Sequence, residues 1–275
     1  MKCPDFDKEF QKYLTAYLEQ HAKDYKNYDA MEEDMPAIYM RWVNQPQDFL
    51  EGFTPGSFFM QYDDGKQLVD WMCEYDKLKI SIPEQLQERI SEMPYATEKR
   101  LVKLLEDESI SENLQCTAIG MLQEMQSDMP KMLYIKRQLK RRERDEAADM
   151  MIESLRTMGK GVVTSILQEI DGAGDAGKIA LLDVLCEYPG SKKAVELCKG
   201  FFKERTAQRA LFAGYLAKLG DDSALPMLYE TARAAATNYL DYIEIRNAIE
   251  ALGGDPPEER DFSEDPYYIS MKSME

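Results

Sequence analysis

An apolar helical pattern recurs five times along the chain, and it constrains the fold more than any other feature. The last apolar residues of the five segments stand 33, 30, 31 and 33 residues apart: Met125, Met158, Tyr188, Leu219 and Leu252. The positions three, four and seven residues earlier are also apolar, apart from Ser154. Residues spaced in this way lie on one face of a helix. The sequence therefore predicts five helices that each bury one face.

Turn residues and shorter helices complete each unit. Gly159, Gly220 and Gly253 directly follow their segments, and Pro189-Gly190 ends the third. Shorter amphipathic stretches lie between the segments, at residues 98–106, 162–170, 194–202 and 225–232. A two-helix unit cannot bury its apolar face alone, so neighbouring units must stack.

The predicted fold class is therefore all-α. We expect a right-handed α-solenoid of about five two-helix repeats over residues 95–253. A small helical N-terminal domain, residues 1–94, should precede it, and an acidic C-terminal tail, residues 254–275, should follow it. We expect disorder in the tail, with Tyr267-Tyr268-Ile269 as a possible anchor.

The last two units carry a motif. Residues 219–228, LGDDSALPML, resemble the turn of HEAT-like repeats of the phycobilisome-lyase type, and residues 246–253, RNAIEALG, resemble the second helix of that unit. The first three units fit by periodicity alone. Such repeats occur in lyase chaperones and scaffolds of bacteria, so the resemblance implies a fold and a capacity to bind proteins rather than one activity.

Residues 42–72 resemble a second family. They follow the pattern W-L-x-x-P-x-x-x-L-x-G-x-x-P of the toxin-binding domain of Xre/ParS-class antitoxins, through Trp42-Val43, Pro46, Leu50, Gly52 and Pro55. Those antitoxins usually carry a DNA-binding helix-turn-helix upstream, and residues 1–41 contain no convincing one. The resemblance implies a small helical packing unit, and it leaves a toxin–antitoxin-like regulator open as an alternative function.

The charge distribution limits the classes of partner. The formal net charge is −17, of which residues 1–95 contribute −9, residues 96–252 contribute −3 and residues 253–275 contribute −5. This acidity argues against unspecific binding to nucleic acid or to an anionic membrane. Stacked repeats expose one helix layer along a concave surface, where such folds bind, so we expect a protein or peptide as the partner.

The location follows from what the sequence lacks. No apolar stretch approaches the ~20 residues that cross a bilayer. The first residues show no apolar region of a secretory signal. The five cysteines have no C-x-x-C spacing, which favours reduced thiols and a cytoplasmic protein.

Motifs that could carry chemistry are weak. Residues 172–178, GAGDAGK, match the phosphate-binding pattern G-x-x-x-x-G-K, but Ile179 follows where the Mg²⁺-binding hydroxyl should be, and the repeat places a turn there. His21 is the only histidine. We therefore predict no catalytic, cofactor-binding or metal-binding residues and expect a non-catalytic scaffold, while an enzyme of unknown type stays open.

Two sets of residues are candidates for partner binding. In the second helices, the column opposite the core reads Gly120, Glu153, Asp183, Gly214 and Asn247, with Arg156 one turn beyond Glu153. If this layer lines a groove, its acidic centre favours a basic or polar peptide.

The second set lies in a basic run, residues 136–144, which holds six positive charges in nine residues. The periodicity places Arg137, Arg141 and Arg144 on one helical face. Either this face is solvated and pairs with Asp145, Glu146 and Asp149, or it docks an acidic partner.

Overall fold

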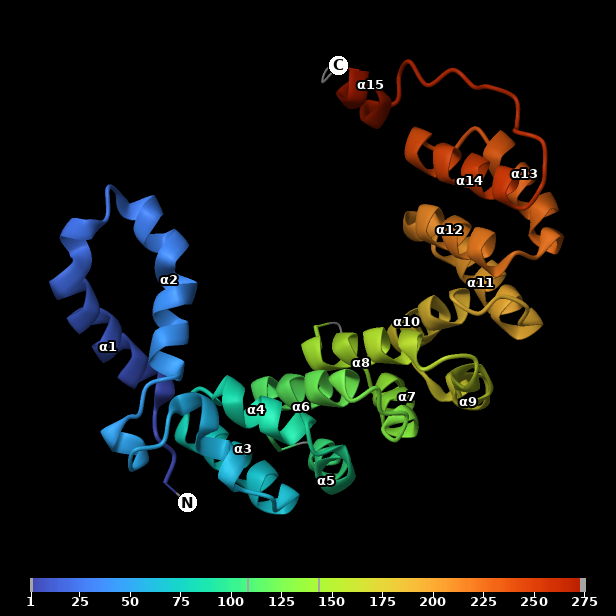
Figure 1. Cartoon of the computed structure of the whole chain (residues 1–275). Coiled ribbons are helices and arrows are strands. Elements are labelled where there is room, and N and C mark those ends of the chain that lie inside the picture. Colours follow the sequence, from blue (N-terminus) through green and yellow to red (C-terminus); the bar gives the residue numbers. More distant parts are fainter. Residues whose placement is uncertain (1, 108, 143, 273–275) are drawn as a thin grey trace. The chain divides into compact units, whose positions relative to one another are not determined.

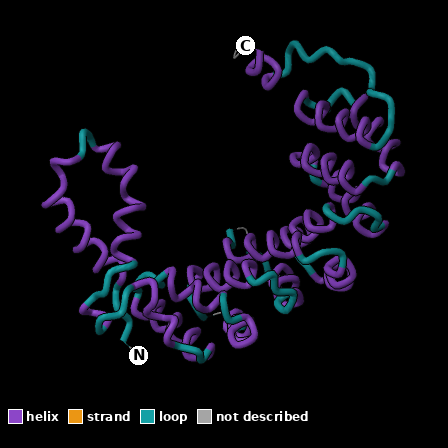
Figure 2. Tube along the Cα trace, in the orientation of Figure 1, coloured by secondary structure: helices purple, strands orange, loops and turns teal. Residues whose placement is uncertain are grey.

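The computed structural model describes residues 2–107, 109–142 and 144–272, and these residues form helices and loops without a β-strand (Figures 1 and 2). The predicted all-α class is confirmed. The chain divides into two compact units, Met1–Pro130 and Lys131–Glu275.

The N-terminal unit contains six α-helices among its described residues: α1 (Phe6–His21), α2 (Tyr28–Val43), α3 (Gly65–Leu78), α4 (Glu84–Ser91), α5 (Pro94–Leu105) and α6 (Glu112–Glu124). Helix α3 packs on α4 and α5, and α6 packs on the same two helices. A seven-residue 3₁₀ helix, Pro55–Gln61, packs on α4.

The first predicted repeat, from residue 95, thus lies within the N-terminal unit, because α5 and α6 bury their apolar faces against α3 and α4. The compact units divide after Pro130, whereas the repeats were predicted to begin after residue 94. The boundary at residue 94 rests on the repeat pattern and stays a prediction.

Aromatic residues fill the core of the N-terminal unit. Phe6 packs against Trp42 and Phe59, with ring centroids 6.1 and 5.7 Å away. Two hydrogen bonds attach the N-terminal segment to α3: Trp71 Nε1 donates to the Lys2 carbonyl (3.1 Å), and Tyr75 Oη donates to the Pro4 carbonyl (3.0 Å). These contacts hold the segment that leads into α1, which begins after the N-cap Asp5, whose side chain accepts a hydrogen bond from the Lys8 amide (3.0 Å).

The C-terminal unit contains α7 (Lys131–Leu139), α8 (Glu146–Thr157), α9 (Gly161–Glu169), α10 (Asp175–Cys186), α11 (Lys192–Glu204), α12 (Arg209–Leu219), α13 (Leu225–Arg233), α14 (Tyr239–Ala251) and α15 (Pro266–Lys272). Helices α8, α10, α12 and α14 pack side by side in one layer, and α11 and α13 pack on α12 and α14 from the other side (Figure 1). Every second helix along the chain, from α8 to α14, therefore lies next to the following one in space.

The apolar register read from the sequence is confirmed by burial. The three inner columns are buried at every position: Leu122, Leu155, Leu185, Leu216, Ile249; Met121, Ser154, Val184, Tyr215, Ala248; and Ala118, Met151, Leu181, Phe212, Ile245. In the outer column only Leu219 is buried, because these residues stand at helix ends. Ser154 is 3% exposed and its Oγ has no hydrogen-bond partner among the described residues, so even the polar exception follows the pattern.

The acidic tail is ordered over the described residues up to 272, and the expectation of disorder is wrong there. Phe262 is buried against Tyr239 and Tyr242, with centroids 5.3 and 5.0 Å away. The Arg260 guanidinium lies over the Phe262 ring (4.9 Å) and donates to the Ala232 carbonyl (3.0 Å). Charge composition alone suggested disorder, but one buried ring and one basic residue secure the segment to the last helix pair. The predicted tyrosine anchor contacts α14, since the rings of Tyr268 and Tyr239 lie 4.9 Å apart.

The contact between α10 and α7 depends on a glycine. A Cβ atom at Gly177 would lie 2.1 Å from the Gln138 carbonyl oxygen, which is backbone and cannot move aside. Gly214 on α12 is the matched case without a close neighbour, since nothing lies within 4 Å of its Cβ position.

We expect Gly177→Ala to lower the free energy of unfolding by about 1–3 kcal/mol, because the added methyl group pushes α10 away from α7. Gly214→Ala should instead raise it by up to ~1 kcal/mol through helix propensity. Urea unfolding followed by circular dichroism measures both. If the two substitutions shift stability in the same direction, the close approach of α7 and α10 is wrong.

Candidate partner-binding surface

Three of the predicted partner-binding residues form one ion-pair cluster. The Arg156 guanidinium on α8 contacts the Glu153 carboxylate one turn earlier (Nη1–Oε2 3.1 Å) and pairs with the Asp183 carboxylate on α10. The side chain of Asp183 is only 17% exposed, whereas that of Glu153 is 60% exposed. Arg156 therefore neutralises the centre of the surface that the sequence suggested was acidic.

The repeat register explains why these residues meet. Glu153 and Asp183 are equivalent positions of neighbouring second helices, and those helices pack side by side. A long arginine side chain on the same face can therefore reach both carboxylates.

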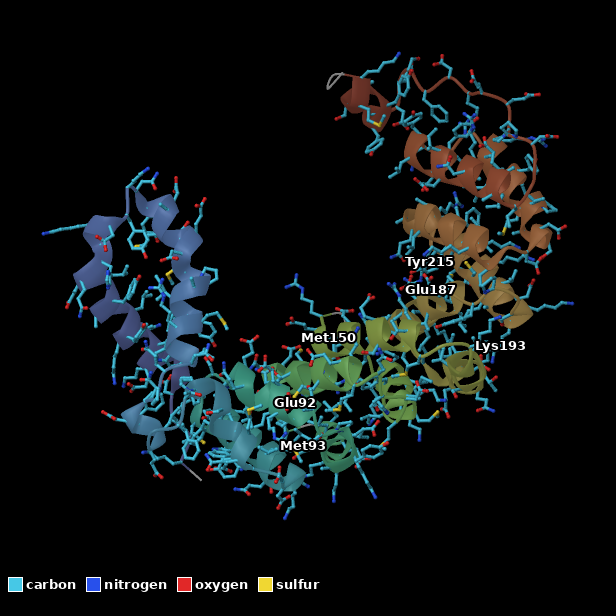
Figure 3. All side chains as sticks on the ribbon, in the orientation of Figure 1. Glu92, Met93, Met150, Glu187, Lys193 and Tyr215 are labelled. Carbon is cyan, nitrogen blue, oxygen red and sulfur yellow. The ribbon has the colours of Figure 1, made fainter. Side chains whose placement is uncertain are left out.

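A second pair, Glu187 on α10 and Lys218 on α12, crosses the next helix contact at 3.3 Å. Figure 3 labels Glu187 on this layer and Lys193 on α11, on the other side of the unit. Ion pairs thus link α8 to α10 and α10 to α12 along one face.

Asn247 lies outside this cluster. It is exposed on α14, and the neighbouring ion pair there, between Arg246 and Glu250 (3.0 Å), is confined to α14. The structure thus brings together Glu153, Arg156 and Asp183 and leaves Asn247 as a separate exposed position two helices away.

Apolar side chains on the same face were missed by the sequence reasoning. Three residues before the column of Glu153, Asp183 and Gly214 stand Met150, Ala180 and Leu211, which belong to the same helix face. Leu211 is 40% exposed, and Leu240 at the start of α14 is 42% exposed. The column opposite the core contains only polar residues and glycines, so it carries no apolar signal. Leu211 is visible in the sequence three residues before Gly214, and Leu240 seven residues before Asn247.

The basic run does not form one helical face, and this prediction is wrong. Helix α7 ends at Leu139, so Arg141 and Arg144 lie in the following turn. Extending the helix would stack like charges at i, i+4, as with Arg137 and Arg141. Asp145 is the N-cap of α8, with a non-helical backbone (φ of −148°, ψ of 86°). Its side chain accepts a hydrogen bond from the Ala148 amide (3.0 Å).

Two of the three arginines stabilise the turn between α7 and α8. Arg137 pairs with the buried Asp145 (3.2 Å), and Arg141 pairs with Asp149 while donating to Gln138 Oε1 (2.9 Å). The expected pairing with Asp145 and Asp149 is confirmed. Arg144 is exposed, and its role in docking stays a prediction.

The motifs with possible chemistry lie in structural positions. His21 Nδ1 is 3.0 Å from Asp24 Oδ2 at the end of α1, and its ring stacks on Tyr17. Residues 172–178 span the turn from α9 into α10, so a helix precedes them where a phosphate-binding loop would follow a strand. Asp175, in this segment, forms an ion pair with Arg205 on the far side of α11 in the sequence.

The buried cysteines are poor nucleophiles. Burial raises the pKa of the Cys186 thiol to about 12, and it also raises the pKa of Cys198. A thiol reacts as its thiolate, which is scarce at neutral pH at such a pKa. Across the described ranges, no three His, Cys, Asp or Glu side chains gather as a metal site would require.

Comparisons of the chain with protein-family models, with curated proteins and with solved structures gave no match. In the part of the chain that the structure describes, no helix has the length and apolar character needed to cross a membrane. The surface of α8, α10, α12 and α14 is therefore interpreted from its own chemistry.

The pairing of Arg156 with Asp183 predicts a loss of stability when the cation is removed. Arg156→Met should lower the free energy of unfolding by about 1–3 kcal/mol, because it leaves a largely covered carboxylate without its partner. Arg246→Met removes an exposed pair with Glu250, which solvent screens, and should cost less than Arg156→Met.

Chemical denaturation of both variants compares the two costs. Adding Asp183→Asn to Arg156→Met should recover part of the loss, because the orphaned charge is then absent. Equal costs for Arg156→Met and Arg246→Met would contradict a structural role for this cluster.

Proposed function

We propose that the chain is a non-catalytic scaffold or adaptor of the bacterial cytoplasm that holds a protein or peptide on a right-handed, HEAT-like α-solenoid. The second helices, α8, α10, α12 and α14, form the inner layer of this solenoid. The repeated burial of three columns at intervals of 30 to 33 residues supports the repeat architecture. The side-by-side packing of the four helices supports their assignment to one layer.

The observation that carries the binding function is the mixed surface of this layer. Leu211 and Leu240 expose apolar area, and the small residues Ala180 on α10 and Gly214 on α12 belong to the same layer of helices. The exposed carboxylates of Glu153 and Glu187 lie on the same helices as this strip. A strip with small residues at its centre lets a backbone approach closely, as a groove for a helix requires.

The partner that fits this surface is an amphipathic helix with basic residues. Its apolar face would cover Leu211 and Leu240, and its basic residues would pair with Glu153 and Glu187. Asp183 is less suited to bind a partner, because its side chain is only 17% exposed.

Site-specific photo-crosslinking in the native host tests the position of the partner. A photoreactive amino acid at Leu211 should form adducts with one defined protein, identified by mass spectrometry. The same amino acid at Glu230, an exposed position on α13, serves as the control and should not. Equal adducts at both positions would show that the partner does not use this layer.

Charge reversal then tests the chemistry of recognition. The double variant Glu153→Lys, Glu187→Lys should weaken binding of the crosslinked protein by about tenfold or more, because it replaces attraction by repulsion on the rim. Glu230→Lys should leave the dissociation constant unchanged. Unaltered binding by the double variant, with its helical circular dichroism intact, would refute the acidic recognition surface.

A further inference from the structure

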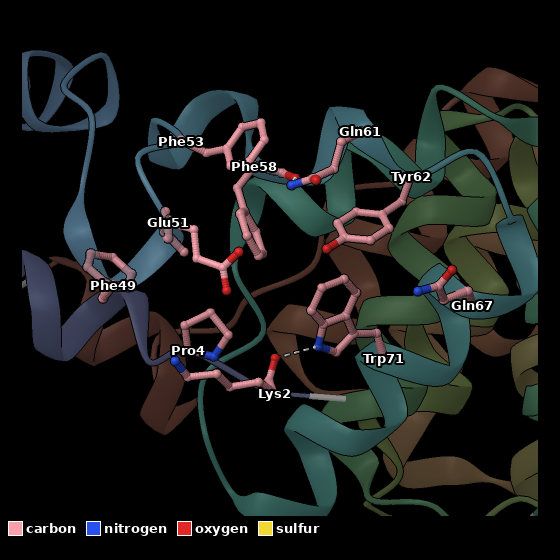
Figure 4. Close-up of a pocket in the computed structure, with 11 residues that line it drawn as sticks. Lys2, Pro4, Phe49, Glu51, Phe53, Phe58, Gln61, Tyr62, Gln67 and Trp71 are labelled. Carbon is pink, nitrogen blue, oxygen red and sulfur yellow. Dashed lines mark hydrogen bonds between the residues drawn. The ribbon is translucent and has the colours of Figure 1, made fainter.

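A pocket in the N-terminal unit has a chemistry that the proposed scaffold function does not use. It encloses about 290 Å³ and is lined from the N-terminal segment, from the loop after α2, from the 3₁₀ helix Pro55–Gln61 and from α3. Five of the eleven residues that line it are aromatic, and one carboxylate, that of Glu51, lines it (Figure 4).

Three of the rings form a corner. The planes of Phe58 and Trp71 are inclined by 65°, those of Phe58 and Tyr62 by 68°, and those of Tyr62 and Trp71 by 87°. Their centroids lie between 5.0 and 6.1 Å apart. Steeply inclined rings present faces and edges in different directions. Trp71 is 4% exposed, so the half-buried rings of Phe58 and Tyr62 offer most of the accessible surface.

Hydrogen bonds and an ion pair hold Trp71 and Tyr62 in place. The indole N–H of Trp71 is already donated to the Lys2 carbonyl (3.1 Å), so this side chain offers no free donor. The Tyr62 carbonyl accepts from Arg89 Nε on α4 (3.2 Å), and Arg89 also pairs with Asp63 (2.7 Å). Trp71 and Tyr62 are therefore preorganised before any ligand arrives.

The carboxylate stands at the tip of a tight loop. Backbone hydrogen bonds from Gln47 to the Phe53 carbonyl (3.0 Å) and from Gly52 to the Gln47 carbonyl (3.1 Å) close this loop. Glu51 has φ of 56° and ψ of 31°, a left-handed conformation that disfavours every residue with a Cβ atom. Lys79 and Gln126 have the same conformation, and at Glu51 it ends the 3₁₀ helix Asp48–Leu50 and places the glutamate at the loop tip.

The Glu51 carboxylate has no ion pair or hydrogen bond among residues 2–107, 109–142 and 144–272. Figure 4 shows its oxygens and the Tyr62 hydroxyl directed into the same open space. The only basic residue that lines the pocket is Lys2, which forms no ion pair with Glu51. An unneutralised carboxylate beside aromatic faces creates a negative potential that selects a cation with an apolar shell.

We propose that this pocket binds an alkylammonium group, held by cation–π contacts to Phe58, Tyr62 and Trp71 and by the charge of Glu51. The volume suits a single such group with its short alkyl chain. The source is a small free amine or a lysine side chain of another protein, and the two are distinguished below. The inference concerns the N-terminal unit alone and does not depend on the solenoid surface.

Calorimetric titration of the full chain with choline, and with 3,3-dimethyl-1-butanol as its uncharged analogue of the same shape, tests the charge requirement. We expect saturable binding of choline at least about fivefold tighter than that of the alcohol. Equal affinities, or no saturable binding of choline, would overturn the proposal.

Matched variants locate the site. Glu51→Gln and Tyr62→Leu should each weaken choline binding by about fivefold or more. Glu19→Gln on α1 and Tyr95→Leu on α5, which alter exposed residues away from the pocket, should leave it unchanged. Lys2→Met should strengthen binding, because it removes a positive charge from the lining of the pocket and with it the repulsion of a bound cation.

Weakening by Lys2→Met, or equal losses in the control variants, would contradict the assignment. Thermal unfolding of each variant establishes whether the pocket variants are folded. Glu51→Gln changes an exposed loop tip, so it keeps the test decisive even if Tyr62→Leu is unfolded. Titration with Nα-acetyl-lysine amide and its trimethylated form then assigns the source. Tighter binding of either than of choline indicates a protein side chain, and weaker binding of both indicates a free amine.

Discussion

The arrangement of the C-terminal unit depends on one constraint: each second helix must bury three columns of side chains, and only the neighbouring helices can cover them. Leu155, Leu185 and Leu216 occupy equivalent positions on α8, α10 and α12, and each is buried. Because neighbouring second helices bury equivalent positions, equivalent positions on the faces opposite the core also lie next to each other. The exposed column that carries Glu153 and Asp183 is therefore a consequence of core packing and not a separate design.

This constraint determines where charges can pair. Helices at a fixed spacing bring like positions together, so Glu153 and Asp183 would repel each other without a cation between them. Arg156 lies three residues after Glu153 and reaches both carboxylates. A similar contact recurs one helix further on, from Glu187 to Lys218. The ion pairs thus offset the repulsion between carboxylates that core packing brings together. The more exposed carboxylates, such as that of Glu153, stay accessible to a partner.

The sequence predicted what local periodicity controls and missed what depends on distant contacts. The buried columns were predictable because the helical period is a local property. The end of α7 at Leu139 was not predictable from periodicity, because the residues up to Arg144 continue the helical spacing; the N-cap Asp145 and like-charge repulsion decide it. The order of the tail depends on Phe262 packing against Tyr239 and Tyr242, and composition cannot reveal such a pairing. The aromatic pocket likewise assembles residues from four segments, of which the loop tip at Glu51 carried no signal beyond the adjacent Gly52.

The two candidate surfaces differ in how their charges are balanced, and this difference indicates different kinds of ligand. On α8 and α10 most charges are paired, so a partner must gain affinity from exposed apolar area and from a few rim carboxylates over an extended contact. In the N-terminal pocket a single carboxylate is unpaired and is surrounded by rings, so a small cation can gain its affinity at one point. A protein with both surfaces could therefore bind a helix along one unit and an ammonium group in the other. The position of Glu51 beside aromatic rings, together with the absence of an ion pair to it within the described residues, is what separates the pocket from an ordinary acidic surface.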